Sequence, residues 1–177
     1  FGRPVRVVPR LETAKVILAL DSDFLGEETG SVRNGRAFGA NRRIDGPEST
    51  MTRLYAVEAG HSVTGASADH RLRLAGSRIE AYLKALGRKI GTLGVDLSAL
   101  SAGLTGDAPV QDAAHWIDAV AADLVANRGT SAILVGRRQP ARVHALAIAI
   151  NAALGNFGQT LDEVPERRVD RDGEGVD

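Results

Sequence analysis

The chain has 177 residues, of which 44% are apolar and 25% charged, and this composition is typical of one globular domain with a hydrophobic core. It contains 22 basic and 22 acidic residues, and this balance argues against a nucleic-acid-binding surface, which needs a basic excess. Cysteine is absent, which excludes disulfides, thiolate catalysis, Cys-ligated zinc and all-Cys iron–sulfur clusters within this sequence.

The first half of the chain predicts strands and one short helix. Its first residues lead into a strand pattern, and short apolar runs follow at residues 15–20 and 53–58. A short helix is predicted at 32–43, and the segment 51–86 has the pattern strand, polar loop, short strand and helix. The two apolar runs lack alternating polarity, which is typical of parallel strands that are buried on both faces.

The second half predicts three helices, each with apolar side chains on one face, and one more strand. The helices are expected at residues 77–90, 112–127 and 140–154, and the strand is expected at 131–136. Ser77 and Glu80 have the spacing of a capping box, so the first of these helices is expected to begin at Ser77. The Gly-rich stretch 87–109 is expected to be a long surface connection with one helical turn at 96–100.

Strands that alternate with helices of these lengths predict βαβ units. The expected fold is therefore α/β, a Rossmann-like three-layer domain with a mainly parallel sheet over residues 1–164. The charged segment 165–177 is expected to be a disordered tail. No apolar run is long enough for a direct membrane span. The sequence begins at Phe1 without Met and without a signal-like segment, which indicates a piece of a longer chain or a mature product, and we expect the first.

Acidic residues follow the first two predicted strands. Asp21 and Asp23 follow the first strand and Glu58 ends the second, at the edge where parallel sheets usually bind ligands. Carboxylates there are suited to a cation or to ribose hydroxyls, and a purely structural alternative is that the aspartates cap the turn that follows. Of the four histidines, His115 and His144 fall inside predicted helices, whereas His61 and His70 flank the loop after the second strand and are the two that can face a ligand.

The sequence contains none of the common phosphate-binding or nucleophile motifs after its strands. There is no G-x-G-x-x-G, no P-loop and no nucleophile elbow. No pair of histidines has a short metal-ligand spacing. From the chemistry of the residues alone, the sequence predicts an α/β domain without an identifiable active site or metal site.

Four segments, taken in order, resemble the molybdopterin oxidoreductase (DMSO reductase) family. They are AKVILALDSDFLG, VRNGRAFGANRRI, RLYAVEAGHSVTGASADHRLRLAGSRI and AILVGRRQPARVHALAIAINAALGNFGQT, and the resemblance extends over about residues 1–160. Within the family they are most similar to the iron–sulfur, molybdopterin-oxidoreductase-like subunit of alternative complex III, a quinol:electron-acceptor oxidoreductase.

The sequence departs from the active molybdenum enzymes where the cofactor would be held. Where those enzymes have Asp-Pro-Arg after the strand, this chain has Glu58, Ala59 and Gly60. Where they have Pro-Gly-Thr-Asp, whose Asp receives the guanine of the cofactor, this chain ends the motif with Arg78. A guanidinium only donates hydrogen bonds, so Arg78 cannot replace a carboxylate that accepts from guanine.

The resemblance therefore implies a non-catalytic scaffold domain of a large respiratory electron-transfer subunit. It implies no cofactor in this fragment, with iron–sulfur clusters in other, Cys-bearing parts of the parent chain. The partners would be those other domains and the subunits of a membrane-bound complex, on its periplasmic side. In this interpretation Asp21, Asp23, Glu58 and Thr64 belong to a vestigial cofactor site, and Thr64 and Asp69 fix its loop through local side-chain-to-backbone bonds.

Two other functions remain open from the sequence. The first is a molybdopterin-guanine-dinucleotide-binding domain of an active molybdenum oxidoreductase, with the ligand in the loops after Leu20, Glu58 and Gly136. The second is a regulatory module that binds a small ligand.

Overall fold

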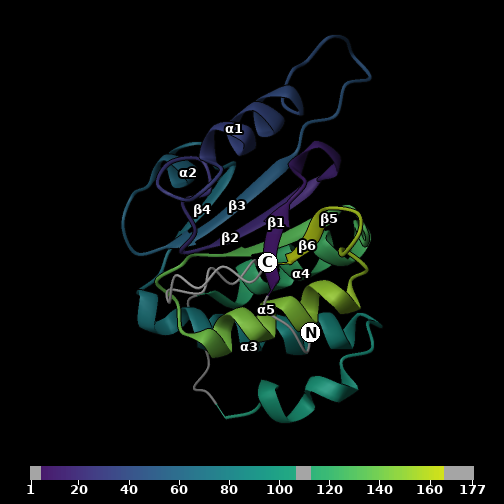
Figure 1. Ribbon diagram of the computed structural model, residues 1–177. Helices are drawn as coiled ribbons and strands as arrows, with labels where there is room; N and C mark the ends of the chain where they lie inside the picture. The colour runs from purple at the N-terminus through teal and green to yellow at the C-terminus, as the bar shows by residue number, and fades with distance from the viewer. Residues whose placement is uncertain (1–4, 107–112, 166–177) are drawn as a thin grey trace, which may run out of the picture.

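The computed structural model describes residues 5–106 and 113–165 as a single α/β unit (Figure 1). The strands are β1 (Val5–Pro9), β2 (Val16–Leu20), β3 (Arg53–Glu58), β4 (His70–Arg73), β5 (Ser131–Val135) and β6 (Leu161–Pro165). The α-helices are α1 (Ser31–Ala40), α2 (Val63–Ala66), α3 (Ile79–Thr92), α4 (Ala114–Ala126) and α5 (Ala141–Ala153). Short 3-10 helices occur at Leu11–Thr13, Gly76–Arg78 and Ser98–Leu104. Apart from Pro165, the tail predicted at residues 165–177 lies outside the described residues.

The main sheet has four parallel strands in the order β4-β3-β2-β5. Figure 1 shows α3, α4 and α5 on one side of this sheet and α1 and α2 on the other. The predicted three-layer, Rossmann-like α/β fold is confirmed. The three predicted strands are present as β2, β3 and β5, each within one residue of its expected bounds.

Burial of the central strand on both faces explains its sequence. All five residues of β2 are buried. Leu18 and Leu20 pack into the larger core under α3, α4 and α5, whereas Ile17 and Ala19 pack into the smaller core under α1. Because successive side chains of a strand point to opposite faces, both faces need apolar residues and no polar alternation is left.

The start of α3 differs from the prediction. Residues 76–78 form a 3-10 turn, and the N-cap of α3 is Arg78, which makes no side-chain capping bond. Ser77 therefore lies inside this turn instead of at the cap, and the predicted capping box is wrong. Glu80 instead forms ion pairs with Lys84 and Arg142, and the pair with Arg142 fastens α3 to α5.

The surface connection predicted at residues 87–109 is shorter in the structure, because helices occupy part of this range. α3 continues to Thr92 through Gly87, and the 3-10 helix Ser98–Leu104 covers more residues than the single predicted turn. A Cβ at Gly87 would lie 2.6 Å from a methyl carbon of Leu104. This helical glycine therefore has a packing role, because it lets the following segment approach the helix.

A two-stranded antiparallel ribbon joins the two ends of the described chain. β1 pairs with β6, with Val7 opposite Glu163. The start of the chain was expected to form a strand, whereas β6 was not foreseen. Three of the five residues of β6, Glu163, Val164 and Pro165, are exposed, and the strand has no continuous apolar run, so its pairing with distant β1 is the main determinant of its conformation.

Candidate functional site

The loops after β2, β3 and β5 meet at the carboxyl edge of the sheet. Leu20 is level with Val57 on one side and with Val135 on the other. The chain runs from β2 to β3 and β4 in one direction and then returns to place β5 on the opposite side of β2. Ligands of open parallel sheets usually bind outside the carboxyl ends at such a reversal of strand order.

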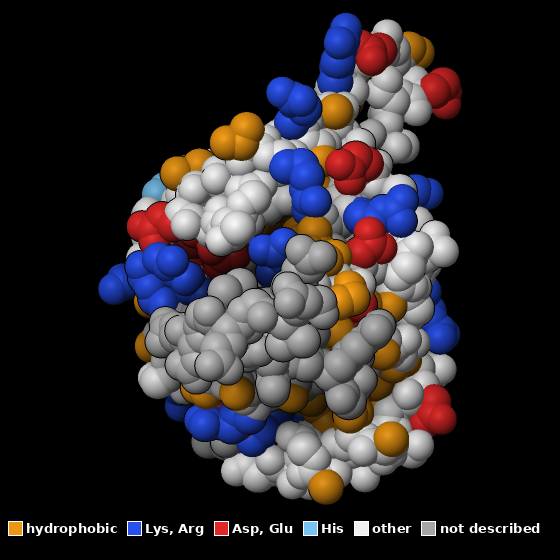
Figure 2. Space-filling model, in the orientation of Figure 1, with side chains coloured by type: hydrophobic (Ala, Val, Ile, Leu, Met, Phe, Trp, Pro, Cys, Tyr) orange, Lys and Arg blue, Asp and Glu red, His pale blue; other side chains and the backbone are white. Residues whose placement is uncertain are grey.

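A cavity of about 410 Å³ lies at this edge. Its lining includes the three acidic residues that the sequence singled out, Asp21, Asp23 and Glu58, together with His61. In Figure 2 acidic side chains lie in a hollow of the surface with basic side chains next to them. The structure thus brings the predicted carboxylates to one place, and their bonding partners decide what they can do there.

Asp21 joins the loop after β2 to the loop after β5. Its Oδ2 accepts a hydrogen bond from Nε2 of Gln139 at 3.0 Å, and its backbone has a φ of 51°, which is uncommon for a residue other than glycine. A Cβ at Gly136 would lie 1.7 Å from the backbone oxygen of Asp21. The two loops therefore touch at a point where only glycine fits.

Asp23 holds α2 against the loop after β2. Its Oδ1 accepts from the backbone N–H of Thr64 at 2.9 Å, and its Oδ2 accepts from the backbone N–H of Glu27 at 3.1 Å. Burial alone would raise the pKa of Asp23, but the hydrogen bonds from Thr64 and Glu27 together outweigh burial and lower the pKa. Both oxygens of this carboxylate are engaged by the protein.

Glu58 is the most buried of the three acids, with 5% of its surface exposed. Oγ of Ser62 donates to its Oε2 at 2.6 Å, and Nε of Arg71 donates to its Oε1 at 2.7 Å. A Cβ at Gly65 would lie 1.8 Å from Oε1, so the carboxylate is packed directly on α2. Glu58 therefore serves as an internal acceptor at the end of β3.

Thr64, the fourth predicted site residue, is fully buried and does not line the cavity. Its Oγ1 accepts from the backbone N–H of Leu25 at 3.1 Å, while Oδ2 of Asp69 accepts from the backbone N–H of Leu54 at 2.8 Å. The sequence predicted side-chain-to-backbone bonds from both residues. The bonds exist, but each reaches a different segment instead of its own loop, so the prediction that they are local is wrong.

Three of the four histidines lie where the sequence analysis placed them, and His70 differs. His61 lines the cavity, as expected. His70 does not face it, because its ring stacks on Tyr55 at 4.9 Å between centroids. The sequence left His70 as a residue that can face a ligand, and it does not line this cavity. The other two lie in helices as predicted, His115 in α4 and His144 in α5.

Residues after β5 complete the edge; the loop after Gly136 was named for a ligand in the alternative function, but none of its residues was singled out. Arg137 and Arg138 line the cavity, and Arg138 forms an ion pair with Glu27 at 3.1 Å. Glu28 also lines it; burial raises the pKa of Glu28, and Oγ of Ser22 donates to its Oε2 at 3.0 Å. The sequence does contain one signal for Arg137 and Arg138: both arginines directly follow a predicted strand, as the aspartates do.

Within residues 5–106 and 113–165, no group of three or more His, Asp or Glu side chains is placed to hold a metal ion. Across those same ranges, no helix combines the length and the apolar character needed to cross a bilayer.

The groups at this edge match the phosphates of a nucleotide cofactor only in part. Such phosphates are usually held by free backbone N–H groups, but the N–H groups of Thr64 and Glu27 already donate to Asp23. The carboxylates in the cavity lining would repel phosphate, whereas Arg137 and Arg138 in the same lining would attract it. At the start of α3, where the resemblance places a guanine-binding Asp, the chain has Arg78.

Neither a search of protein-family models nor a search of curated proteins gives a match to this chain.

Proposed function

We propose that this chain is a non-catalytic scaffold domain of a large respiratory electron-transfer subunit that resembles molybdopterin oxidoreductases. The proposal is supported by the order of the four resembling segments and by an α/β fold that suits that family. The observation that carries it is the bonding of the carboxylates at the ligand edge. Asp21, Asp23 and Glu58 each accept hydrogen bonds from the chain itself.

This bonding has an energetic consequence for any ligand. A hydrogen bond to a charged group contributes about 1.5–3 kcal/mol. A ligand that used Glu58 would have to replace the bonds from Ser62 and Arg71, and one that used Asp23 would detach the N–H of Thr64. The edge is therefore better suited to holding loops together than to exchanging ligands.

Exposed apolar side chains are available for contacts with neighbouring domains or subunits. Figure 1 shows the loop between α1 and β3 projecting beyond the sheet, and this loop carries Ile44 and Met51, which are 56% and 49% exposed. Val32 on α1 and Val63 on α2 are also largely exposed. These side chains are single exposed apolar groups, which also occur on monomeric proteins, so they are compatible with a partner without requiring one.

The alternative is a domain that binds molybdopterin guanine dinucleotide in an active molybdenum oxidoreductase. Two observations favour it, namely the cavity of about 410 Å³ and the arginines Arg137 and Arg138 at its lining. The engaged carboxylates and Arg78 weigh against it, which is why we favour the scaffold.

Metal analysis of the full-length parent protein separates the two functions. The scaffold proposal predicts iron from clusters in Cys-bearing parts of the parent chain, without molybdenum or tungsten. Either of these metals at a stoichiometric level would overturn it.

Titration of the chain with GMP, GDP or a pterin dinucleotide is the second test. No saturable binding is expected at micromolar concentration. Micromolar binding that is lost in Glu58→Ala or Asp21→Ala would show a working site and would also overturn the scaffold proposal.

A further inference from the structure

A second cavity, of about 460 Å³, lies between β1, β5 and α5. Its size is within the range of small-molecule pockets. Glu28 and Arg137 line both cavities, so this pocket begins where the carboxyl-edge cavity ends. β1 forms one wall, and Arg33 of α1 fastens it by donating from Nη2 to the carbonyl oxygen of Pro9 at 2.7 Å.

The walls of this pocket are mainly apolar. They include one aromatic ring and several aliphatic side chains from four different elements or loops, namely Val7, Phe24, Leu134, Ala147 and Ile148. Phe24 and Ala147 are almost completely buried, so these walls are part of the packed core. Such a lining favours an apolar body over a fully hydrated ion.

Asn34 carries an acceptor without a partner. This residue lines the pocket and is 3% exposed. Its Nδ2 donates to the carbonyl oxygen of Phe24 at 3.2 Å, whereas its Oδ1 is buried and has no hydrogen-bond partner in the described part of the chain. Flipping the amide would set two acceptors against each other at Phe24, so the orientation is fixed. Buried acceptors are normally satisfied, so this one marks a point of incomplete packing in the pocket wall, and it has no accessible surface to offer a ligand directly.

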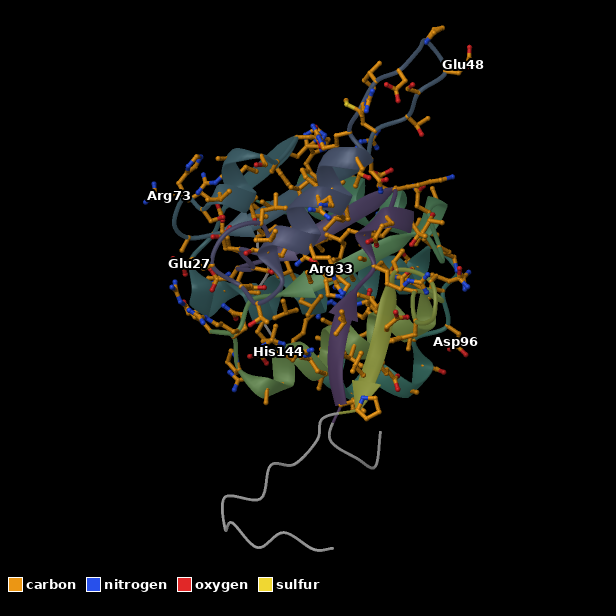
Figure 3. All side chains as sticks on the ribbon, turned by 45° about the horizontal axis from the view of Figure 1, so that its top comes forward. Glu27, Arg33, Glu48, Arg73, Asp96 and His144 are labelled. Atoms are coloured by element: carbon orange, nitrogen blue, oxygen red, sulfur yellow. The ribbon has the colours of Figure 1, made fainter. Side chains whose placement is uncertain are left out.

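Charged groups of both signs complete the lining. Glu28 is half-buried and offers a carboxylate, which has further acceptor capacity beyond its bond from Ser22. Arg137 and Arg6 are exposed and offer guanidinium groups. Figure 3 labels His144 on α5, and this side chain also lines the pocket. Acceptors therefore lie toward the interior and cations toward the solvent.

We propose that this pocket binds a free amino acid with an apolar side chain. The ammonium group of the ligand donates to the carboxylate of Glu28, the ligand's own carboxylate meets Arg137, and its side chain packs on the walls around Phe24. A simple amine would make no use of Arg137, and a simple carboxylic acid would bring a second negative charge to Glu28 without a cation to pair with it. This inference does not depend on the scaffold function.

Isothermal titration of the chain with L-phenylalanine and L-leucine tests the proposal. Saturable binding is expected for both. 3-Phenylpropionate lacks the ammonium group and phenylalaninamide lacks the carboxylate, so each should bind about ten- to hundredfold more weakly than phenylalanine. No binding of either amino acid, or equal binding of 3-phenylpropionate, would overturn the proposal. Phenylalaninamide that binds as tightly as phenylalanine would indicate the N-terminus of a peptide instead and would overturn it as well.

Adjacent arginines provide a matched pair of variants. Arg137 lines this pocket, whereas Arg138 lines only the carboxyl-edge cavity and pairs with Glu27. Both are exposed, so neither replacement threatens the fold. Arg137→Gln should weaken phenylalanine binding about tenfold or more, and Arg138→Gln should leave it unchanged. Equal effects of the two replacements would place the ligand elsewhere and overturn the proposal.

Discussion

Arg71 donates from Nε to Oε1 of Glu58 across 2.7 Å, and this pair joins β4 to the end of β3. The same guanidinium donates from Nη2 to the carbonyl oxygen of Gly60 at 2.8 Å. Only 6% of the Glu58 side chain and 24% of the Arg71 side chain are exposed, so water screens the pair weakly. A carboxylate at a usual ligand position is thus built into the connection between two strands.

Replacing Glu58 by alanine should destabilise the chain. The variant leaves Arg71 and Ser62 without their acceptor, and the expected loss is about 2–4 kcal/mol in the free energy of unfolding. Urea unfolding measures this loss. Glu27→Gln is the control, because its ion pair with Arg138 is exposed and should contribute less than about 1 kcal/mol. If Glu58→Ala is instead more stable than the parent, Glu58 has the behaviour of a functional residue held at a cost in stability.

Replacing Gly65 by alanine should also destabilise the folded chain, because the new methyl group would collide with the Glu58 carboxylate. The new methyl group would lie 1.8 Å from Oε1 of Glu58, and we expect a loss of about 1–3 kcal/mol. The double variant with Glu58→Ala should lose less than the sum of the two single losses, because the steric conflict is then absent. Gly60→Ala is the matched control, since a Cβ at that residue would have nothing within 4 Å of it. Strict additivity in the double variant would contradict the contact.

The local pattern of apolar and polar residues was sufficient to predict three of the four strands of the main sheet. β2, β3 and β5 are continuous apolar runs followed by polar residues, and burial on both faces requires that pattern. β6 escaped prediction because its conformation depends on pairing with β1, which is distant in sequence. The capping box failed because Gly76–Arg78 adds a 3-10 turn before α3, which spacing alone does not reveal.

The candidate site was predicted in position but not in bonding. Parallel strands bring their carboxyl ends to one edge, so Asp21 and Glu58 were expected to lie close together there. The partners that engage them, Gln139 and Arg71, come from other loops and strands. The role of His70 depended on a ring contact with Tyr55 of the neighbouring strand, for which the sequence contains no local signal.

The bond between Asp69 and Arg42 predicts a dependence of stability on pH. Two hydrogen bonds from the guanidinium of Arg42, assisted by the backbone N–H of Leu54, lower the pKa of Asp69 below its ordinary value of 3.8. Since the folded pKa is below the unfolded one, the stabilisation is complete above about pH 4 and is lost as the pH falls through the folded pKa. Asp69→Asn should therefore cost about 1–3 kcal/mol at neutral pH and progressively less in acid.

Urea unfolding of both proteins between neutral pH and about pH 3 checks this expectation. Asp162→Asn is the control, because Asp162 forms only a long, exposed ion pair with Arg10 at 3.6 Å, and its loss should stay within about 0.5 kcal/mol. A stability difference for Asp69→Asn that stays constant down to the acid end of the range would contradict the assignment.

Replacing Gly136 by alanine should have the largest effect of the glycine variants. The obstacle is the backbone oxygen of Asp21, 1.7 Å from the new methyl group, and a backbone atom cannot rotate away as a side chain can. The loops after β2 and β5 must then separate, which strains the bond from Gln139 to Asp21 and costs about 3 kcal/mol or more. Gly39→Ala in α1 is the control, because nothing lies within 4 Å of its Cβ position and alanine favours the helix by about 0.5–1 kcal/mol. Urea unfolding should show the first variant destabilised and the second stabilised, and a neutral Gly136→Ala would mean that the two loops do not meet at the carboxyl edge.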